Sequence, residues 1–478
     1  MKMNSAFILL FLVYNSFSGS CTAPSAENQN DTQKDTSVIV QKKIYEKFEP
    51  GKVTDPVTCS TNQEMSFAVY LPSNYSTEKK YPVIAFFDPH ASGKLPVEKY
   101  KELAEKYGYI IACSNNSQNG MMGDKLTQIY TAFLNDLKNR FSIDEKRFYL
   151  GGFSGGARVA SSVILKEYGY AGMIGCGAGW TKVTKPLENN FTYISFAGNQ
   201  DFNLTELRAL NENLDSKKIP HVLIEFEGKH EWPPAEIMEN AFIWLLFDAV
   251  KKNIIPKNDS LVSSYISKNE KEIKKLESKK ELYKLYNAYT QLIAFTEGLT
   301  DNSSYKTSLQ KLSEKEEMKK VLQEMEAVYS KEEQLKQDYA GYMQSKDDAW
   351  WNSEMVKINS IIKTDKDKNI RAMYQRVLAY LSLMAYSSAS GAIKFNELKG
   401  AEHFLTIYKL VDPENPEHAY LSALVYMKQN KSDDALASLK ESVKLGFNDY
   451  NRLMAEKDFV SLKDNAGFKE IVQKIKPQ

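Results

Sequence analysis

Short apolar runs alternate with amphipathic segments over residues 45–252. The runs are rich in β-branched and aromatic residues and are bounded by turn residues, which is typical of buried strands. We expect strands at 66–72, 81–88, 109–113, 147–152, 171–176, 191–198 and 221–228, and helices at 97–108, 127–141, 157–169 and 235–250. Strands that alternate with helices predict an α/β domain with a mostly parallel sheet and helices on both faces.

The pattern changes at about residue 255. Glycine and proline become scarce, and lysine, glutamate, leucine and tyrosine dominate. Apolar positions between Met318 and Tyr329 mark one face of a helix, and Ser313 with Glu316 has the spacing of a capping box. We therefore expect an all-α second domain over residues 255–478.

The second domain carries a short internal repeat. Ala401 and Leu405 recur 34 residues later as Ala435 and Leu439. This period resembles that of tetratricopeptide repeats over about residues 397–447, which would make the helical domain a binding surface for a protein partner. The alternative is an ordinary helical bundle with chance periodicity.

The amino-terminal residues have the layout of a secretory signal over residues 1–20. A basic start is followed by an apolar core and by small residues before Cys21. The end of this segment resembles a bacterial lipobox, although Ser18 stands where leucine is usual, and the resemblance implies that Cys21 is lipidated. We expect a lipid-anchored protein of the bacterial cell envelope, on an outer membrane, with residues 22–44 as a polar tether. The alternative is a plain signal peptide and an incidental cysteine.

The charge and the cysteine content of the chain exclude few classes of protein. The 62 basic and 61 acidic residues give a net charge of +1, so no basic excess favours a nucleic-acid partner. Among Cys59, Cys113 and Cys176 at most one disulfide can form, and buried free thiols are the alternative. No cluster of residues has metal-ligand spacing.

The segment Gly152-Phe153-Ser154-Gly155-Gly156 fits the pattern G-x-S-x-G. It lies between a predicted strand and a predicted helix, which is the setting that a nucleophile elbow requires. Gly152 and Gly156 would allow the chain to turn sharply. The amide of Gly155, at the positive end of the helix, is the expected donor to an oxyanion.

A serine nucleophile needs a base, and the base needs an acid to orient it. Of the five histidines in the chain, His230 follows the predicted strand 221–228 in a loop. Asp201 follows the predicted strand 191–198 in the same way. The order Ser154, Asp201, His230 is that of α/β-hydrolases. Three other acidic residues could orient His230, but they lie on or next to the predicted strand that leads to it and not on a separate loop: Glu225, Glu227 and Glu231.

Residues 45–252 resemble α/β-hydrolase esterases of the polyhydroxybutyrate depolymerase-like and feruloyl-esterase-like group. The resemblance rests on FAVYLPSNY, GGFSGGA, FAGNQDFN and the loop after His230. It implies hydrolysis of a carboxylic ester through an acyl-serine intermediate, without a cofactor. It also implies a short acyl or hydroxycinnamoyl ester, for example on a carbohydrate, as the substrate.

One part of the chain departs from this group. Where such enzymes usually carry His-Gly after the third strand, residues 88–93 read DPHASG. Pro89 has no amide proton to donate. The amide of His90 is therefore the expected second donor to the oxyanion, and that of Ala91 is the next candidate.

Polar and aromatic residues near other strand ends are candidates for substrate contact. Asn115 and Asn116 follow the predicted strand 109–113, and Trp180 and Trp232 could stack on a ring. The alternatives are a turn around Asn119-Gly120 and ordinary packing of the two tryptophans.

Two other functions are compatible with this sequence. The hydrolase domain could be a catalytically retired scaffold in an envelope protein that binds partners, which the DPHASG segment favours. The triad could also serve a peptidase, because a triad alone does not choose the leaving group.

Overall fold

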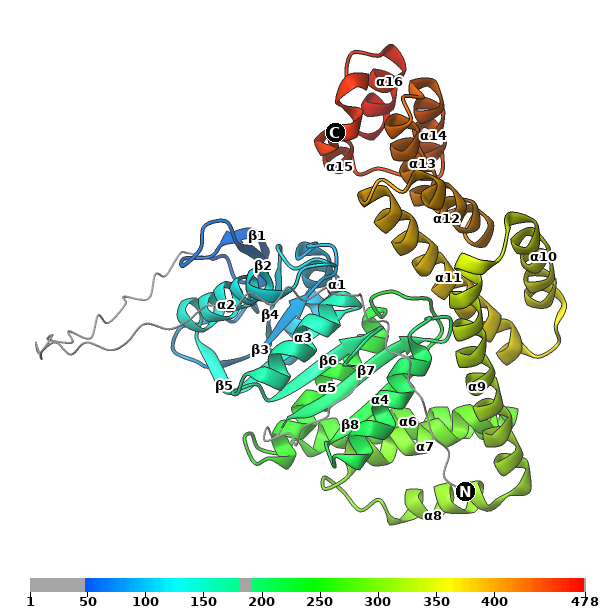
Figure 1. Cartoon of the computed structure of the whole chain (residues 1–478). Helices are drawn as coiled ribbons and strands as arrows, with labels where there is room; N and C mark the ends of the chain where they lie inside the picture. The colour runs from blue at the N-terminus through cyan, green and yellow to red at the C-terminus, as the bar shows by residue number, and fades with distance from the viewer. Residues whose placement is uncertain (1–47, 181–190, 477–478) are drawn as a thin grey trace, which may run out of the picture. The chain divides into compact units, whose positions relative to one another are not determined.

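The computed structural model describes residues 48–180 and 191–476 (Figure 1). These described residues belong to one compact unit. The predicted signal segment, the predicted lipidation site at Cys21 and the predicted tether over 22–44 lie outside the described residues.

The first half of the chain builds an eight-stranded sheet in the order β1-β2-β4-β3-β5-β6-β7-β8. The strand β2 is antiparallel to its neighbours β1 and β4, and the remaining strands are parallel. The strands are β1 (Val53–Thr58), β2 (Ser66–Tyr70), β3 (Tyr81–Phe87), β4 (Ile110–Ser114), β5 (Ile143–Phe153), β6 (Gly172–Cys176), β7 (Thr192–Gly198) and β8 (His221–Phe226).

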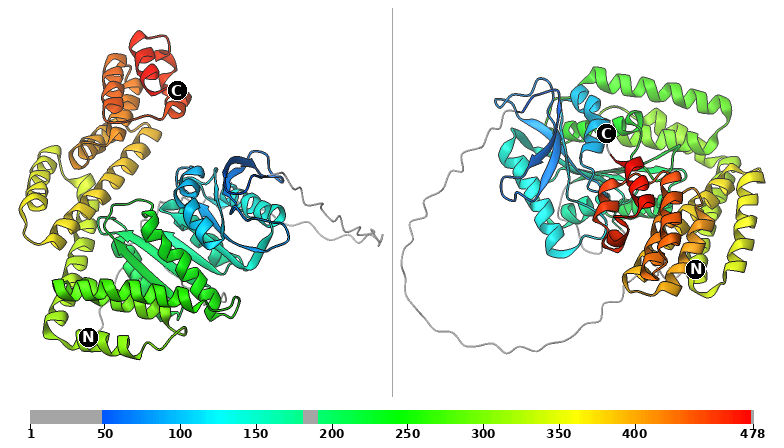
Figure 2. Two further views of the ribbon diagram at one scale, coloured as in Figure 1. Left: turned by 180° about the vertical axis from the view of Figure 1, so that it is seen from behind. Right: turned by 90° about the horizontal axis from the view of Figure 1, so that it is seen from above.

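Helices cover both faces of this sheet, because its central strands are apolar on both sides (Figures 1 and 2). One face packs against α2 (Gly123–Arg140), α3 (Gly155–Lys166) and α4 (Leu204–Ser216). The other face packs against α1 (Lys94–Tyr107) and α5 (Ala235–Lys251). The predicted α/β-hydrolase fold is therefore confirmed.

Two elements of this domain were not predicted. The strand β1 is a partly exposed edge strand that contains a proline, so its sequence lacks the apolar alternation of a strand. The helix α4 has buried leucines at positions 204, 207, 210 and 214, a helical spacing that the sequence carries openly.

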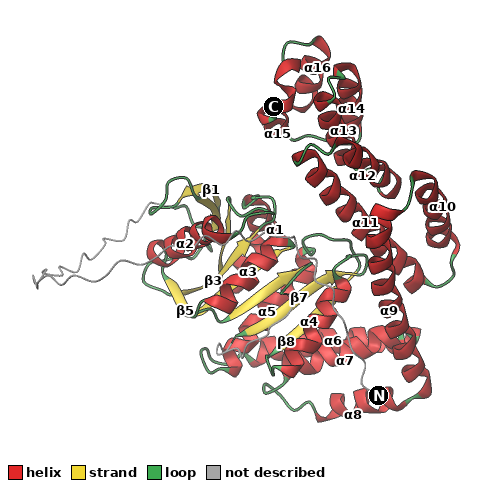
Figure 3. Cartoon of the chain, in the orientation of Figure 1, coloured by secondary structure: helices red, strands yellow, loops and turns green. Residues whose placement is uncertain are grey.

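The rest of the described chain is helical, as predicted (Figure 3). The capping box expected at Ser313 is wrong, because Ser313 lies inside α8 and its hydroxyl donates to the carbonyl of Leu309. The helices are α6 (Asp259–Lys279), α7 (Leu282–Thr296), α8 (Ser303–Glu314), α9 (Glu316–Ser345), α10 (Asp348–Thr364), α11 (Lys368–Lys394), α12 (Leu398–Val411), α13 (Pro416–Lys428), α14 (Ser432–Lys444), α15 (Tyr450–Ala455), η1 (Lys457–Leu462) and α16 (Ala466–Ile475).

The hydrophobic core runs across the expected domain boundary at residue 255. The helices α6 and α7 share one apolar cluster with α1, α5 and the sheet. Met325 and Tyr329 of α9 join the cluster on the opposite face. A separate core begins at Val328 and continues to Ile475. The first helices after residue 255 are thus built onto the hydrolase domain.

The repeat positions occupy matching places on two helices. Ala401 and Leu405 of α12 and Ala435 and Leu439 of α14 are all buried. The preceding helix α11 has 27 residues, about twice the length of α12, so it does not continue the period. A tetratricopeptide character for residues 397–447 stays a prediction.

Cys59, Cys113 and Cys176 are free and buried. Burial raises the pKa of the Cys59 thiol to about 12 and raises those of Cys113 and Cys176 well above the usual range. These thiols are therefore packing residues. In the part of the chain that the structure describes, no helix is long and apolar enough to cross a membrane.

Candidate active site

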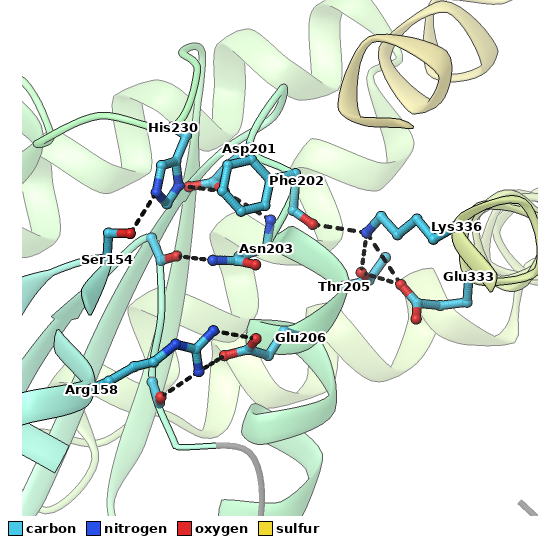
Figure 4. A network of polar contacts seen from close by, with 12 residues as sticks. Ser154, Arg158, Asp201, Phe202, Asn203, Thr205, Glu206, His230, Glu333 and Lys336 are labelled. Carbon is cyan, nitrogen blue, oxygen red and sulfur yellow. Dashed lines mark hydrogen bonds and ion pairs between the residues drawn. The ribbon is translucent and has the colours of Figure 1, made fainter. Parts of the chain in front are cut away.

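Three side chains from the carboxyl ends of β5, β7 and β8 meet at one edge of the sheet (Figure 4). His230 Nε2 lies 2.8 Å from the hydroxyl oxygen of Ser154, and His230 Nδ1 lies 2.9 Å from Asp201 Oδ1. Parallel strands deliver their carboxyl ends to the same edge, so residues far apart in the chain converge there. The geometry is that of a serine nucleophile, its base and the acid that orients the base.

Ser154 occupies a sharp turn between β5 and α3. Its backbone has φ 50° and ψ −120°, a conformation that non-glycine residues rarely adopt. A Cβ on Gly152 would overlap the backbone of Gly156, and a Cβ on Gly156 would overlap the carbonyl of Phe87. Gly151 has to be small for a different reason, because a Cβ there would lie 2.7 Å from the ring of Phe86. The turn that presents Ser154 therefore requires small residues around it.

Asp201 is buried, and its carboxylate is positioned by its own loop. Its Oδ1 accepts hydrogen bonds from His230 and, at 2.8 Å, from the amide of Asn203. The side-chain amide of Asn203 donates in turn to the carbonyl of Gly177 at 2.8 Å. Because the carboxylate accepts the proton on Nδ1, the Nε2 atom is left to accept the proton of Ser154.

Two aromatic rings flank the imidazole of His230. The ring of Phe202 lies 4.2 Å away between centroids, and that of Phe153 lies 4.7 Å away. Both phenylalanines are sequence neighbours of triad members, Asp201 and Ser154. The same two turns thus supply the reactive groups and the packing that restrains the histidine.

The amide of Gly155 opens α3, where the first helical N–H groups have no intrahelical acceptor. As the first residue after Ser154, Gly155 can supply a donor at the site, with the positive end of the helix behind it. The expected second donor is different. The amide of His90 donates to Asp88 Oδ1 at 2.8 Å, and the amide of Ala91 points to the Asp88 carbonyl at 3.4 Å.

This is a correction to the expectation for His90, and its cause is the aspartate that opens the DPHASG segment. The buried Asp88 carboxylate accepts from the amides of His90 and Ser92 and, through Oδ2, from the indole of Trp232 at 2.9 Å. Because these backbone amides donate to the charged carboxylate of Asp88, they are not available to an oxyanion.

The two asparagines expected to contact substrate serve the fold instead. Asn115 donates to the Asp55 carboxylate at 2.8 Å and to the hydroxyl of Ser66 at 3.2 Å. Asn116 accepts from the amide of Ser66 at 2.7 Å and donates to the carbonyl of Glu64. Both side chains connect the loop after β4 to residues at the start of β2. Their hydrogen-bonding groups are therefore already used within the protein and not by a substrate.

The two tryptophans are also packing residues. Trp180 is buried beside the rings of Phe191 and Tyr193. Trp232 is buried against Phe86 and Phe153 behind the triad. Neither indole is exposed to a substrate.

The rival acids face other partners. Glu225 pairs with Arg208, Glu227 accepts from Asn199, and Glu231 accepts from the amide of Lys229. The ring of His221 bonds to the carbonyl of Ile219, as expected of a structural histidine. Within residues 48–180 and 191–476 there is no group of His, Cys, Asp and Glu side chains that could hold a metal ion.

Sequence reasoning missed Gly177, which lies directly behind the triad. It follows β6 with a φ of +63°. A Cβ there would lie 3.0 Å from both Asp201 Oδ2 and His230 Cε1, and 2.9 Å from the ring of Phe153. The segment GCGAGW shows a glycine after a strand, but nothing in it points to Asp201 or His230.

No protein family model matches this sequence, and no curated protein matches it. Solved structures with a similar fold include esterase B from Lactobacillus rhamnosis, which is 14% identical with a TM-score of 0.36 over 43% of this chain and 91% of that one. A fluorophosphonate-binding serine hydrolase from Staphylococcus aureus is 12% identical with a TM-score of 0.34 over 41% and 99% of the two chains. A ferulic acid esterase is 16% identical with a TM-score of 0.33 over 40% and 94%. These similarities are distant, so the functional assignment rests on the geometry of this chain.

Gly177→Ala should lower the kcat of the ester hydrolysis expected of Ser154 by about 10- to 100-fold, because the new methyl group displaces Asp201 or His230. Hydrolysis of p-nitrophenyl acetate by purified protein measures this. Gly108→Ala is the matched control, since Gly108 also has a positive φ (+70°) but no atom lies within 4 Å of an added Cβ. Equal losses in the two variants would contradict a role for the space behind the triad.

Proposed function

We propose that this protein is a serine hydrolase that cleaves carboxylic esters through an acyl-enzyme on Ser154. The observation that carries the proposal is the continuous chain of contacts from Ser154 to His230 to the buried Asp201. The strained turn at Ser154 adds to it, because such strain persists where function requires it.

The geometry suggests a sequence of steps. The hydroxyl oxygen of Ser154 attacks the ester carbonyl carbon while its proton passes to His230 Nε2. Asp201 holds the imidazole and stabilises the charge that it gains. The amide of Gly155 donates to the negative oxygen of the tetrahedral intermediate. His230 then protonates the departing alcohol, and a water molecule activated by the same imidazole releases the acid. None of these steps calls on a cofactor.

The substrate that we propose is a short acyl or hydroxycinnamoyl ester, for example on a carbohydrate. The support for this choice is the resemblance of GGFSGGA and FAGNQDFN to esterase sequences. A peptidase would use the same triad, and a comparison of ester and anilide substrates with one acyl group separates the two.

A second candidate function is a retired hydrolase scaffold that binds partners. One observation favours it, namely that Asp88 takes the His90 amide away from the oxyanion position. We further propose that the protein is exported and anchored by a lipid on Cys21, and that its helical region binds a protein partner.

Ser154→Ala should lower kcat on p-nitrophenyl acetate or butyrate by about 100-fold or more, because the nucleophile is lost. His230→Ala should cause a loss of similar size. The double variant should be no worse than either single variant, because residues that act as one unit are not additive.

His221→Ala is the matched control for His230→Ala, since His221 is the first residue of β8, the strand that precedes His230, and its ring bonds to a backbone carbonyl. Its activity should stay close to that of the wild type. Ester hydrolysis that survives Ser154→Ala would refute the proposed function, and additive losses in the double variant would show that Ser154 and His230 do not act together.

A further inference from the structure

The loop that carries Asp201 is held from outside the hydrolase domain. Residues 199–203 join β7 to α4, and two of their backbone carbonyls accept hydrogen bonds from helices far along the chain. Figure 4 shows the one at Phe202. Lys336 of α9 donates from Nζ to the carbonyl of Phe202 at 2.8 Å. Arg376 of α11 donates from Nη1 to the carbonyl of Asn199 at 2.7 Å. The two contacts stand on either side of Asp201.

One buried carboxylate fixes both cations in place. Glu332 is fully buried, and its Oε2 accepts from Arg376 Nε at 2.8 Å and from Nη2 at 2.5 Å. Its Oε1 lies 2.9 Å from Lys336 Nζ. Lys336 also bonds to Thr205 at 2.9 Å and to Glu333 at 3.2 Å. Arg376 and Lys336 are themselves buried.

Such a cluster is poorly explained as a source of stability. Removing charges from water costs about as much as their mutual attraction returns, so a buried ion pair adds little net stability. What it supplies is direction, since a guanidinium held by a carboxylate presents its remaining N–H groups along fixed lines. Here those lines end on the loop of the catalytic acid.

The consequences for the triad are direct. Phe202, whose carbonyl accepts from Lys336, packs its ring against that of His230 with the centroids 4.2 Å apart. Asp201, the preceding residue, accepts the Nδ1 proton of the same histidine. A shift of this loop would move the acid and the ring together, and displacements of about 1 Å can cost about 100-fold in rate.

We propose that Arg376 and Lys336 are positioning residues of the triad, so that helices α9 and α11 are part of the working site. This rests on the proposed function of Ser154. It predicts that the helical region controls kcat through the placement of Asp201, and that a partner bound there would change the rate through the same contacts.

The test uses the full chain with Arg376→Met combined with Glu332→Gln. This pair removes one positive and one negative charge, and Lys336 keeps its ion pair with Glu333, so no buried charge is left unpaired. We expect kcat on p-nitrophenyl acetate to fall about 10- to 100-fold with KM little changed. The Nδ1 proton of His230, observed by NMR, should also shift or broaden.

The matched control is Arg452→Met combined with Glu417→Gln. That ion pair is bidentate, with contacts of 2.6 and 2.9 Å, and it belongs to α13 and α15, away from the loop. It should lower the melting temperature but leave kcat unchanged. A second test variant, Lys336→Met, serves if the first does not fold.

The outcomes separate the two proposals. A wild type without Ser154-dependent hydrolysis refutes the proposed function. An active wild type whose folded Arg376 and Lys336 variants keep wild-type kcat and an unchanged Nδ1 proton refutes the positioning role. A fall in kcat as large in the Arg452 control also refutes it, because the loss is then a general effect of destabilised helices.

The oxyanion site lacks its expected second donor, because the His90 amide donates to Asp88. The side chain of Asn119 lies against Gly155, where an added Cβ would overlap its Oδ1. The Asn119 amide donates to the carbonyl of Pro89 at 2.8 Å, so its loop is tied to the DPHASG segment. Its exposed side-chain amide has no hydrogen-bond partner among the described residues.

We infer that Asn119 Nδ2 is the second donor to the oxyanion, in place of the His90 amide. The terminal oxygen and nitrogen of an asparagine exchange places by rotation of the amide, and an arriving oxyanion selects the donor. This inference also rests on the proposed function of Ser154, because the donor serves the intermediate on that residue.

Asn119→Ala should lower kcat by about 100- to 1000-fold with KM little changed, because a donor to the oxyanion acts in the transition state. Gln118→Ala, an exposed neighbour in the same loop, should keep the wild-type rate. A kcat for Asn119→Ala within about threefold of an active wild type would overturn the inference, whereas an inactive wild type would count against the proposed function instead.

Discussion

The turn at Ser154 is the constraint on which the rest of the site depends. The chain must pass from β5 into α3 within one residue that has a positive φ, and this is possible only because Gly152 and Gly156 lack a Cβ. The turn lifts the hydroxyl out of the sheet edge and aims the first amides of α3 at the same point. Asp201 and His230 can then reach Ser154 because β7 and β8 end at the same edge.

The helical half of the chain is joined to this site by charge as well as by apolar packing. The helices α6 and α7 extend the apolar core of the hydrolase domain. Farther along, Arg376 and Lys336 reach back to the loop of the acid. Loops that carry functional residues are usually the mobile part of a fold, and a rigid scaffold has to position them. In this protein part of that scaffold lies in the helical region.

The sequence predicted the fold and the placement of three site residues because both depend on local patterns. Apolar runs mark buried strands, and Ser154, Asp201 and His230 each follow such a run. The role of a side chain within a loop was less accessible. Three residues follow strand ends, as the triad residues do, but their side chains form hydrogen bonds within the fold: Asn115, Asn116 and Trp232.

Long-range contacts set the limit of such reasoning. The Asp88 carboxylate that captures the His90 amide could not be foreseen, because its orientation depends on Trp232, 144 residues away. The hydrogen bond from Arg376 to Asn199 joins residues that are 177 positions apart, so no local pattern in the sequence indicates it. Gly177 was missed for the same reason, since its neighbours are brought to it only by the folded sheet.

The central claim is that Ser154 is an activated nucleophile, and covalent labelling tests it most directly. A fluorophosphonate probe reacts with a serine whose proton a neighbouring base removes. We predict one probe per chain on the peptide that contains Ser154, with no labelling of Ser154→Ala and slower labelling when an ester substrate is present. A folded wild-type protein that takes up no probe, or takes it up at another residue, would contradict the account.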